Sequence, residues 1–493
     1  SGRRRHTRSG RVTGVQTCAL PISAERHDAI VEAALARTLE LSSATHAERR
    51  LALLQARLPV KMGGLGLTPQ LQIREAAWVG AWALCWRPLQ QLHTPFADLD
   101  LALLAGDDFD ELRAAHALLT SERERIADVY QRMDHLVVDY CREGAAHFQF
   151  HPPNLTPREQ LLPLAAFGSD SKFQQHAQRR YSQAVHHAAW LQLLDELRNV
   201  SLRDQVRFIA VSQPFAGAFL NAVPSRKPFR LPTWALRIAI QRRLGLPLSI
   251  ATEERRNRKG QLLDVYGDVA LNAPDTGFGS RHDALLAELV SVVRSVFGRR
   301  VVKEPRDHRS YNAGHRPDFN VADGALDGGH IIGELKLTDQ MTAEATNIGR
   351  RGARVAFGNS RPDLRKQVLG QAERGAPQDG RFDARTGRGY VSSHAGDYAE
   401  ALRRQHTVLC LIFCTFGGFG PEAVKFINGL AKHVDNKLNS PQYEETTWSA
   451  RSWVAFQTQK LSVKLHRAVS WQVGTEHGLG VCQRGMADPR DGE

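Results

Sequence analysis

The sequence predicts an α+β protein of more than one domain, in which a mostly helical N-terminal half precedes an α/β domain. Apolar residues recur at helical spacing through most of residues 24–250. A charged linker that contains Gly follows at Thr252–Gln261. Beyond it, segments with the patterns of strands and of helices alternate, which favours a layered α/β architecture.

Composition points to a globular protein with a polyanionic partner. Of the 493 residues, 42% are hydrophobic and 24% are charged, and no stretch approaches the roughly 20 consecutive apolar residues of a membrane span. The net charge of +13 makes nucleic acid the default partner. We therefore expect DNA and RNA as partners, with no membrane and no small-molecule cofactor. Six scattered Cys favour a reducing, intracellular compartment without a disulfide framework.

Residues 1–23 stand apart from the rest of the chain. Within them, Val12–Ile22 resembles the translation of a common sequencing adapter. We treat these residues as an artefactual or disordered leader and exclude them from the fold; a basic arm is the alternative interpretation. They carry five Arg and no acid, so without them the net charge falls to +8. Because the chain begins with Ser1 and not Met, we expect the reading frame to be truncated at its 5′ end.

Helical periodicity in the first half is interrupted by loops. A break near Ser42–Ser43 and a loop at Arg57–Pro69 follow from polar, Gly and Pro residues. That loop contains GGLGL, but it lacks the Lys-Ser/Thr that completes a phosphate-binding loop, so we predict no nucleotide site there. Further helices are predicted at Asp110–Leu119, Gln174–Leu197, Val206–Phe219 and Thr233–Leu244.

The α/β half opens with a strongly amphipathic helix. Ser280 is its predicted N-cap, Asp283 would occupy position N3, and Gly298 is the predicted stop. Apolar residues between them form one stripe, while Glu288 lies off it.

Two apolar runs, Arg316–Val321 and His330–Leu337, flank a turn rich in Gly and Asp, which predicts a β-hairpin. If the hairpin is centred near Leu326, Asp318 lies directly across from Glu334, with Cβ atoms about 5 Å apart. Two carboxylates this close suit a hard divalent cation, so both are candidate ligands of Mg²⁺ or Mn²⁺.

Lys336 shares a face with Glu334 because side chains alternate along a strand. Its ammonium would lie beside a metal-bound water, where it can orient the nucleophile and offset charge on a phosphate. The predicted site therefore suits hydrolysis of a phosphodiester.

Asp318 together with Glu334-Leu335-Lys336 resembles the PD-(D/E)xK superfamily of nucleases, and the resemblance spans residues 262–436. It implies a Mg²⁺-dependent DNA endonuclease, with Glu288 as the upstream acidic helix residue. It also implies a helix at Arg361–Gln371 whose Gln367 lies beside the active site. The alternative is an exposed hairpin with a surface Glu–Lys pair.

Several basic residues are candidate contacts for nucleic acid. The resemblance suggests that the pair Arg281–His282 contacts phosphate; a polar residue in the first turn of a helix is the alternative for His282. The candidate contacts for the phosphate backbone are Arg316, Arg350, Arg351 and Arg354. For the last three, a solvated basic helix face is the alternative.

The wider chain resembles proteins of early-branching non-LTR retrotransposons over about residues 45–472. The segments that carry the resemblance are RLPVKMGGLGL, FAGAFLNAVPS, RRLGLPL, YGDVAL, SRHDALLAEL and FCTFGGFGPEA. It implies the end of a reverse transcriptase (24–140), a helical linker (141–251), the endonuclease (262–436), and a C-terminal helix with a disordered tail (437–493). The polymerase core would lie upstream, and the nick would prime reverse transcription, in the nucleus if the host is a eukaryote.

One departure from that family concerns zinc. Such proteins often carry a zinc knuckle before the YGD-type segment, but Ala251–Ala273 contains no Cys, so no structural zinc is expected. An alternative function is therefore an inactive nucleic-acid-binding fragment of a decayed element. A third hypothesis is a stand-alone repair or phage-type nuclease.

Overall fold

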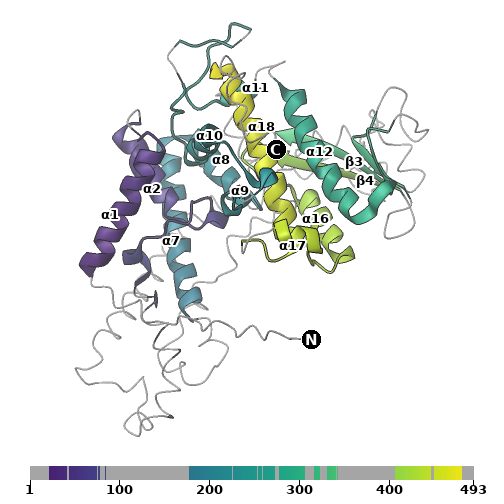
Figure 1. The fold of residues 1–493 in the computed structure, drawn as a ribbon. Helices are drawn as coiled ribbons and strands as arrows, with labels where there is room; N and C mark the ends of the chain where they lie inside the picture. Colours follow the sequence, from purple (N-terminus) through teal and green to yellow (C-terminus); the bar gives the residue numbers. More distant parts are fainter. Residues whose placement is uncertain are drawn as a thin grey trace, which may run out of the picture. The chain divides into compact units, whose positions relative to one another are not determined.

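The computed structural model describes residues 21–41, 44–74, 177–224, 226–251, 254–257, 259–272, 277–305, 316–322, 330–339, 406–445 and 449–479, with positions 76, 77, 81, 84, 91 and 341. The helices are α1 (Pro21–Thr38), α2 (His46–Ala56), α7 (Ala177–Val200), α8 (Leu202–Val211), α9 (Ala218–Asn221), α10 (Thr233–Leu244), α11 (Asp268–Asn272), α12 (Phe278–Phe297), α16 (Pro421–His433), α17 (Ser440–Glu445) and α18 (Trp453–Glu476) (Figure 1). The strands are β1 (Val301–Lys303), β2 (Phe319–Val321), β3 (Ile331–Thr338) and β4 (Thr407–Cys414).

The chain divides into two compact units, and the first comprises residues 1–36, 67–134 and 152–193. In its described part, the carboxylate of Asp28 on α1 accepts hydrogen bonds from the backbone N–H groups of Gln70 (2.9 Å) and Leu71 (3.2 Å). These N–H groups belong to the first turn of a helical segment, where they have no partner within the helix. Nearby, Thr68 Oγ1 lies 3.4 Å from Nε2 of His186 on α7.

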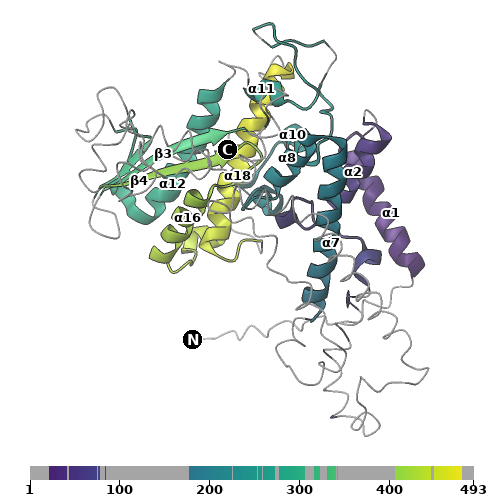
Figure 2. The ribbon, with the colours of Figure 1, turned by 180° about the vertical axis from the view of Figure 1, so that it is seen from behind.

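The second unit comprises residues 37–66, 135–151 and 194–493, and its centre is a four-stranded mixed sheet. The strand order is β1-β2-β3-β4, with antiparallel β1–β2 and β2–β3 pairs and a parallel β3–β4 pair. Figure 2 shows β3 and β4 side by side, with α12 and α16 next to them.

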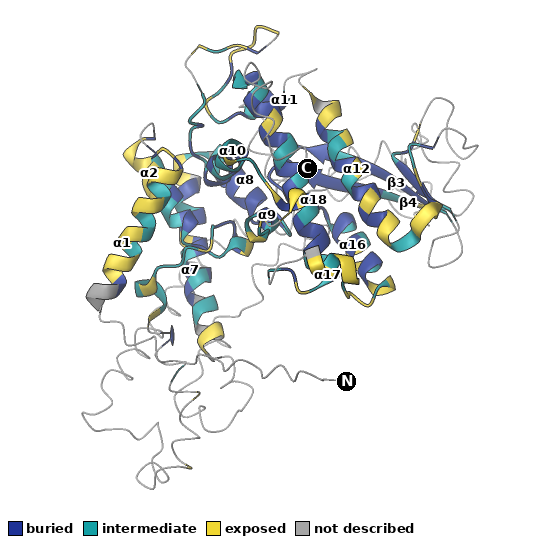
Figure 3. Ribbon diagram, viewed as in Figure 1, coloured by how far each residue is buried: buried dark blue, intermediate teal, exposed yellow. Residues whose placement is uncertain are grey.

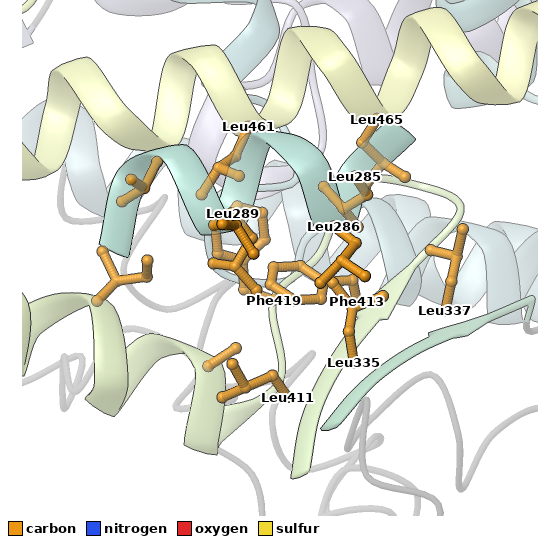
Figure 4. Packing of buried hydrophobic residues seen from close by; sticks show 14 of the residues in the cluster. Leu285, Leu286, Leu289, Leu335, Leu337, Leu411, Phe413, Phe419, Leu461 and Leu465 are labelled. Carbon is orange, nitrogen blue, oxygen red and sulfur yellow. The ribbon is translucent and has the colours of Figure 1, made fainter. Parts of the chain in front are cut away.

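One face of this sheet packs against α12, α16 and α18. Leu335 and Leu411 of the sheet join Leu289 and Leu461 of the helices in a single buried cluster (Figure 4). Gly333 is required beneath this layer, because a Cβ there would lie 2.0 Å from the ring of its cross-strand partner Phe319. The buried inner sides of α12 and α18 and the buried strands appear dark blue in Figure 3.

The predicted α+β class is confirmed, and several elements agree closely with their predicted bounds. Residues 233–244 form α10, and the predicted hairpin is the β2–β3 pair. The domain boundaries stay predictions. The hydrophobic core continues across the boundaries predicted at 251/262 and 436/437, since Ile238 of α10 and Leu465 of α18 belong to the same buried cluster as Leu335.

Two local predictions are wrong. The predicted helix at Val206–Phe219 is interrupted between α8 and α9, because Pro214 disfavours a helical conformation for the residue before it. Ser280 is not the N-cap of α12: the helix begins at Phe278 after Gly277, whose φ of +77° is a conformation that glycine adopts without strain.

Arg243 of α10 joins three distant segments of the second unit. The residue is 1% exposed, and its guanidinium donates hydrogen bonds to the carbonyl groups of Val60 (2.8 Å), Gly64 (3.2 Å) and Ala216 (3.1 Å). Its own carbonyl accepts from Arg207 and, at 2.9 Å, from Gln55. The GGLGL loop is therefore part of the helical core.

A network of charged side chains continues from Arg207 to the sheet. We call it the buried charge network, and its members are Arg203, Arg207, Arg242, Asp204, Asp268 and Asp339. Asp204 contacts Arg207 and Arg203 (3.2 Å each), and Arg203 reaches Asp268 at 2.6 Å. Arg242 then bridges Asp268 (3.4 Å) and Asp339 (3.6 Å), and Asp339 accepts a hydrogen bond from Thr415 Oγ1. The network links α8, α10 and α11 to the ends of β3 and β4.

Replacing Arg243 with Met should lower the free energy of unfolding by about 3–5 kcal/mol, because buried carbonyl groups would lose their donors. The measurement is chemical denaturation. The matched control is Arg237→Met on the same helix, where the guanidinium is 30% exposed and pairs with Glu40; its loss should stay below about 1 kcal/mol. Equal losses in both variants would contradict the role of Arg243.

His466 of α18 should make the protein acid-sensitive. Burial, together with Arg243 and Arg242, lowers its pKa to about 3, so the folded protein favours the neutral imidazole. This contribution to stability is complete above pH 6.5 and is lost as pH falls toward 3. Between pH 6.5 and 5, wild type should lose on the order of 1–2 kcal/mol more than His466→Gln. Identical pH profiles of the unfolding free energy would refute this expectation.

Candidate active site

The register of the hairpin places Asp318 across from Glu334. Phe319 pairs with Gly333 in the β2–β3 ladder, so the next pair outward is Asp318 and Glu334. Along β3, Leu335 and Leu337 face the helices, so Glu334 and Lys336 lie on the opposite face. The predicted cross-strand placement of Asp318 and Glu334 is therefore present in the structure.

Asp318 directly precedes β2 and contacts the part of β3 that extends beyond the β2–β3 ladder. Its Oδ2 accepts a hydrogen bond from the backbone N–H of Leu335 at 2.6 Å, a donor that lies beyond the last ladder pair. Its Oδ1 lies 3.3 Å from Nε2 of His282, in the first turns of α12. The same Nε2 lies 3.2 Å from the carbonyl oxygen of Leu335.

Glu334 and Lys336 form a second, largely buried ion pair. Glu334 is 4% exposed, and its Oε1 lies 2.6 Å from Nζ of Lys336. Burial would lower the pKa of Lys336, but the carboxylates of Glu334 and then Asp318 outweigh it and raise this pKa. Lys336 is therefore an ammonium ion at neutral pH.

His282 is also a cation at neutral pH. Burial would lower its pKa, but the hydrogen bond and charge of Asp318, with smaller contributions from Asp283 and the Leu335 carbonyl, raise it to about 9. Two carboxylates and two cations thus alternate in one cluster, drawn from α12, β3 and the residue that precedes β2.

Two oxygen atoms of this cluster are of the kind that bind a hard divalent cation. Asp318 Oδ1 and the Leu335 carbonyl oxygen converge on one point, which the positively charged Nε2–H of His282 contacts. Oxygen donors of this kind are the ligands that Mg²⁺ prefers. Among the described residues, no group of three or more His, Cys, Asp or Glu side chains is arranged to hold a metal ion. A metal site in this cluster would therefore combine carboxylates with a backbone carbonyl.

Glu288 lies away from the cluster, six residues and about 9 Å further along α12 than His282. Its Oε1 is 3.0 Å from Nζ of Lys460 on α18. Arg281 is 3% exposed and donates from Nη2 to the Leu271 carbonyl at 3.1 Å. Burial lowers its pKa to about 10. The structure therefore places both in contacts between elements of the scaffold.

Arg316 is exposed close to the cluster, two residues before Asp318. Its guanidinium contacts Glu304 after β1, through the carboxylate at 3.1 Å and the backbone carbonyl at 2.9 Å. The remaining predicted site residues, Gln367, Arg350, Arg351 and Arg354, lie outside the described residues.

Two groups of the site were missed by sequence reasoning. The Leu335 carbonyl belongs to a residue identified only as the spacer between Glu334 and Lys336. Cys410 pairs with Glu334 in the parallel β3–β4 register and is 1% exposed. The position of a backbone oxygen cannot be predicted from residue types. Cys410 lies in an apolar run, and its position opposite Glu334 is known only once β4 is paired with β3.

No protein-family model matches the chain, and a search of curated proteins finds no match. In the part of the chain that the structure describes, no helix is both long and apolar enough to cross a bilayer.

The His282–Asp318 pair should stabilise the metal-free protein in a pH-dependent way. Its contribution is complete below pH 6.5, the ordinary pKa of His, and is lost as pH rises through about 9. In EDTA, wild type should lose on the order of 1 kcal/mol over this interval after allowance for solvent screening. His282→Asn should lack this loss. Parallel curves of unfolding free energy against pH would rule out the pair.

Proposed function

We propose that this chain is a metal-dependent DNA endonuclease of the PD-(D/E)xK type. The observation that carries the proposal is the direct cross-strand opposition of Asp318 and Glu334, with Lys336 two residues further along on the face of Glu334. The retrotransposon-like segments add that the chain is the C-terminal part of a non-LTR element protein, which nicks target DNA to prime reverse transcription.

Asp318, Glu334 and the Leu335 carbonyl are the groups that would hold Mg²⁺ or Mn²⁺. When bound, such an ion lowers the pKa of a water and neutralises charge on phosphate oxygens. Lys336, held as an ammonium by Glu334, orients a phosphate oxygen or the attacking water and offsets developing negative charge. His282, a protonated imidazole, supplies an N–H donor to the phosphate or a proton to the leaving oxygen.

The decisive experiment is plasmid nicking in Mg²⁺. Asp318→Asn, Glu334→Gln and Lys336→Ala should each reduce nicking by about 100-fold or more. Asp318→Asn keeps an oxygen that can accept from the Leu335 N–H, so its loss of activity would report charge and not unfolding. The matched control is Asp435→Asn, a carboxylate that is 79% exposed. Wild-type nicking by Asp318→Asn would refute the proposal.

A second candidate function is binding of nucleic acid without cleavage. The observation that favours it is that protein cations contact both carboxylates, His282 at Asp318 and Lys336 at Glu334. On this hypothesis, wild type and Asp318→Asn bind DNA with the same salt dependence, and neither cuts it in any divalent metal.

The role of Glu288 can be tested in the same assay. If it only pairs with Lys460, Glu288→Gln keeps nearly full nicking activity. If it acts as the acidic helix residue that the resemblance implies, the loss approaches that of Asp318→Asn.

A further inference from the structure

A groove lies between the first turn of α12 and one face of α18. It encloses a cavity of about 420 Å³, and the residues that line it include Ser280, Lys464, Arg467, Trp471, Thr475 and Glu476. The last five residues recur on α18 at intervals of three or four, or follow directly, so they line some 18 Å of one helix. We call this feature the α12–α18 groove.

The groove is basic toward the middle of α18. Lys464 and Arg467 are half-buried along its wall. At the other end of the groove, where Gly277 lies against Gln472, α12 begins at Phe278 without a side-chain cap, and Ser280 of its first turn lines the groove. The first N–H groups of a helix carry partial positive charge. Positive charge therefore lies at two places along the groove, at Lys464 and Arg467 and at the start of α12, and such charge suits the phosphate groups of a nucleic acid.

Trp471 adds an aromatic surface one turn beyond Arg467. It is 48% exposed although its ring lies 5.8 Å, centroid to centroid, from that of Trp234. An indole held by a second indole and open on its other side is a platform on which a base can stack. Bases within a duplex are stacked on each other, so such a platform favours a single strand.

Glu476 lines the end of the groove farthest from Lys464, and one of its carboxylate oxygens lacks a hydrogen-bond donor among the described residues. The residue is 8% exposed, and its Oε2 has no hydrogen-bond partner among the residues that the structure describes. The adjacent Thr475 Oγ1 likewise has no partner among these residues. A buried carboxylate oxygen without a donor is unfavourable, and the amino group of a base is a donor of the required kind.

We infer that the α12–α18 groove binds single-stranded nucleic acid, with phosphates at Lys464 and Arg467, a base stacked on Trp471, and an amino-bearing base edge at Glu476. The groove is separate from the Asp318–Glu334 cluster: His282 points to that cluster, whereas Ser280 of the same helix lines the groove. Binding at the groove requires no hydrolysis, so this inference does not depend on the proposed nuclease activity.

The test uses the full chain in EDTA and fluorescence anisotropy with 12-nucleotide oligo-dC and oligo-dT. Lys464→Glu/Arg467→Glu should weaken binding of oligo-dC at least about tenfold and reduce the salt slope by about 1.4, since two phosphate contacts are lost. The charge-matched control is Lys425→Glu/Lys432→Glu on α16, where both residues are exposed. Equal losses in the two double variants would overturn the inference, because only the overall charge would then matter.

Two further variants test the specific contacts. Trp471→Ala should weaken binding about tenfold, while Trp471→Phe keeps a ring and should recover most of the affinity. Wild type should prefer oligo-dC over oligo-dT by about tenfold, and Glu476→Gln should reduce this preference. Unchanged affinity in Trp471→Ala, or equal affinity of wild type for both oligonucleotides, would contradict the inference. Thermal unfolding of each variant verifies that it is folded.

Discussion

The second unit depends on a guanidinium group that is almost completely removed from water. Arg243 satisfies carbonyl groups of two segments that lie far from it in the sequence, and burial followed by the charge of nearby Arg207 lowers its pKa to about 9. Two buried cations side by side are tolerated only where anions compensate them. Asp204 is the first of these, since it contacts Arg207 directly.

The other acidic residues of the buried charge network also compensate the buried arginines, and this network reaches the edge of the candidate active site. Asp339 follows β3 directly and lies three residues after Lys336, and Thr415, its hydrogen-bond donor, follows β4. Arg242 contacts Asp339 and Asp268, and its guanidinium also lies over the ring of Phe416, 4.7 Å from the centroid. Helices far upstream in the sequence therefore help to hold the carboxyl ends of β3, which carries Glu334 and Lys336, and of its neighbour β4. A buried network of this kind contributes more to a unique arrangement than to net stability, because desolvation offsets much of its attraction.

Patterns of local origin could be predicted from the sequence, and long-range contacts could not. The alternation of apolar residues around Glu334, and the centre of the turn near Leu326, were sufficient to place Asp318 opposite Glu334. The start of α12 was missed because a positive φ at Gly277 has no marker beyond the glycine itself. The pairing of Glu288 with Lys460 joins residues that are 172 positions apart, and nothing in the local pattern of either helix indicates it.

The contacts of Arg243 and of the buried charge network explain what several of the segments that resemble retrotransposon proteins do in the fold. RLPVKMGGLGL, FAGAFLNAVPS and RRLGLPL meet at Arg243, through Val60, Gly64 and Ala216. Gly64 and Gly217 are needed there, since a Cβ would lie 1.9 Å from the Leu58 carbonyl oxygen or 2.3 Å from a methyl group of Val60. YGDVAL supplies Asp268 of the charge network. These motifs therefore build a scaffold, and the candidate site is formed by a few residues of the hairpin and α12.

The charges of the cluster suggest how metal and DNA would depend on each other in the proposed nuclease. With His282 protonated, its charge and that of Lys336 offset the two carboxylates, and among the described residues the only further acid in contact with His282 is Asp283, which is 65% exposed. The cluster alone therefore offers a divalent ion limited net attraction. For an ion to be held by Asp318 Oδ1 and the Leu335 carbonyl, the His282 N–H that contacts both would have to move away. A DNA phosphate would add negative charge and would give the displaced imidazolium a new acceptor. Binding of the ion and of the substrate should therefore be mutually reinforcing, as linkage requires of any pair of ligands that each favour the same rearranged state.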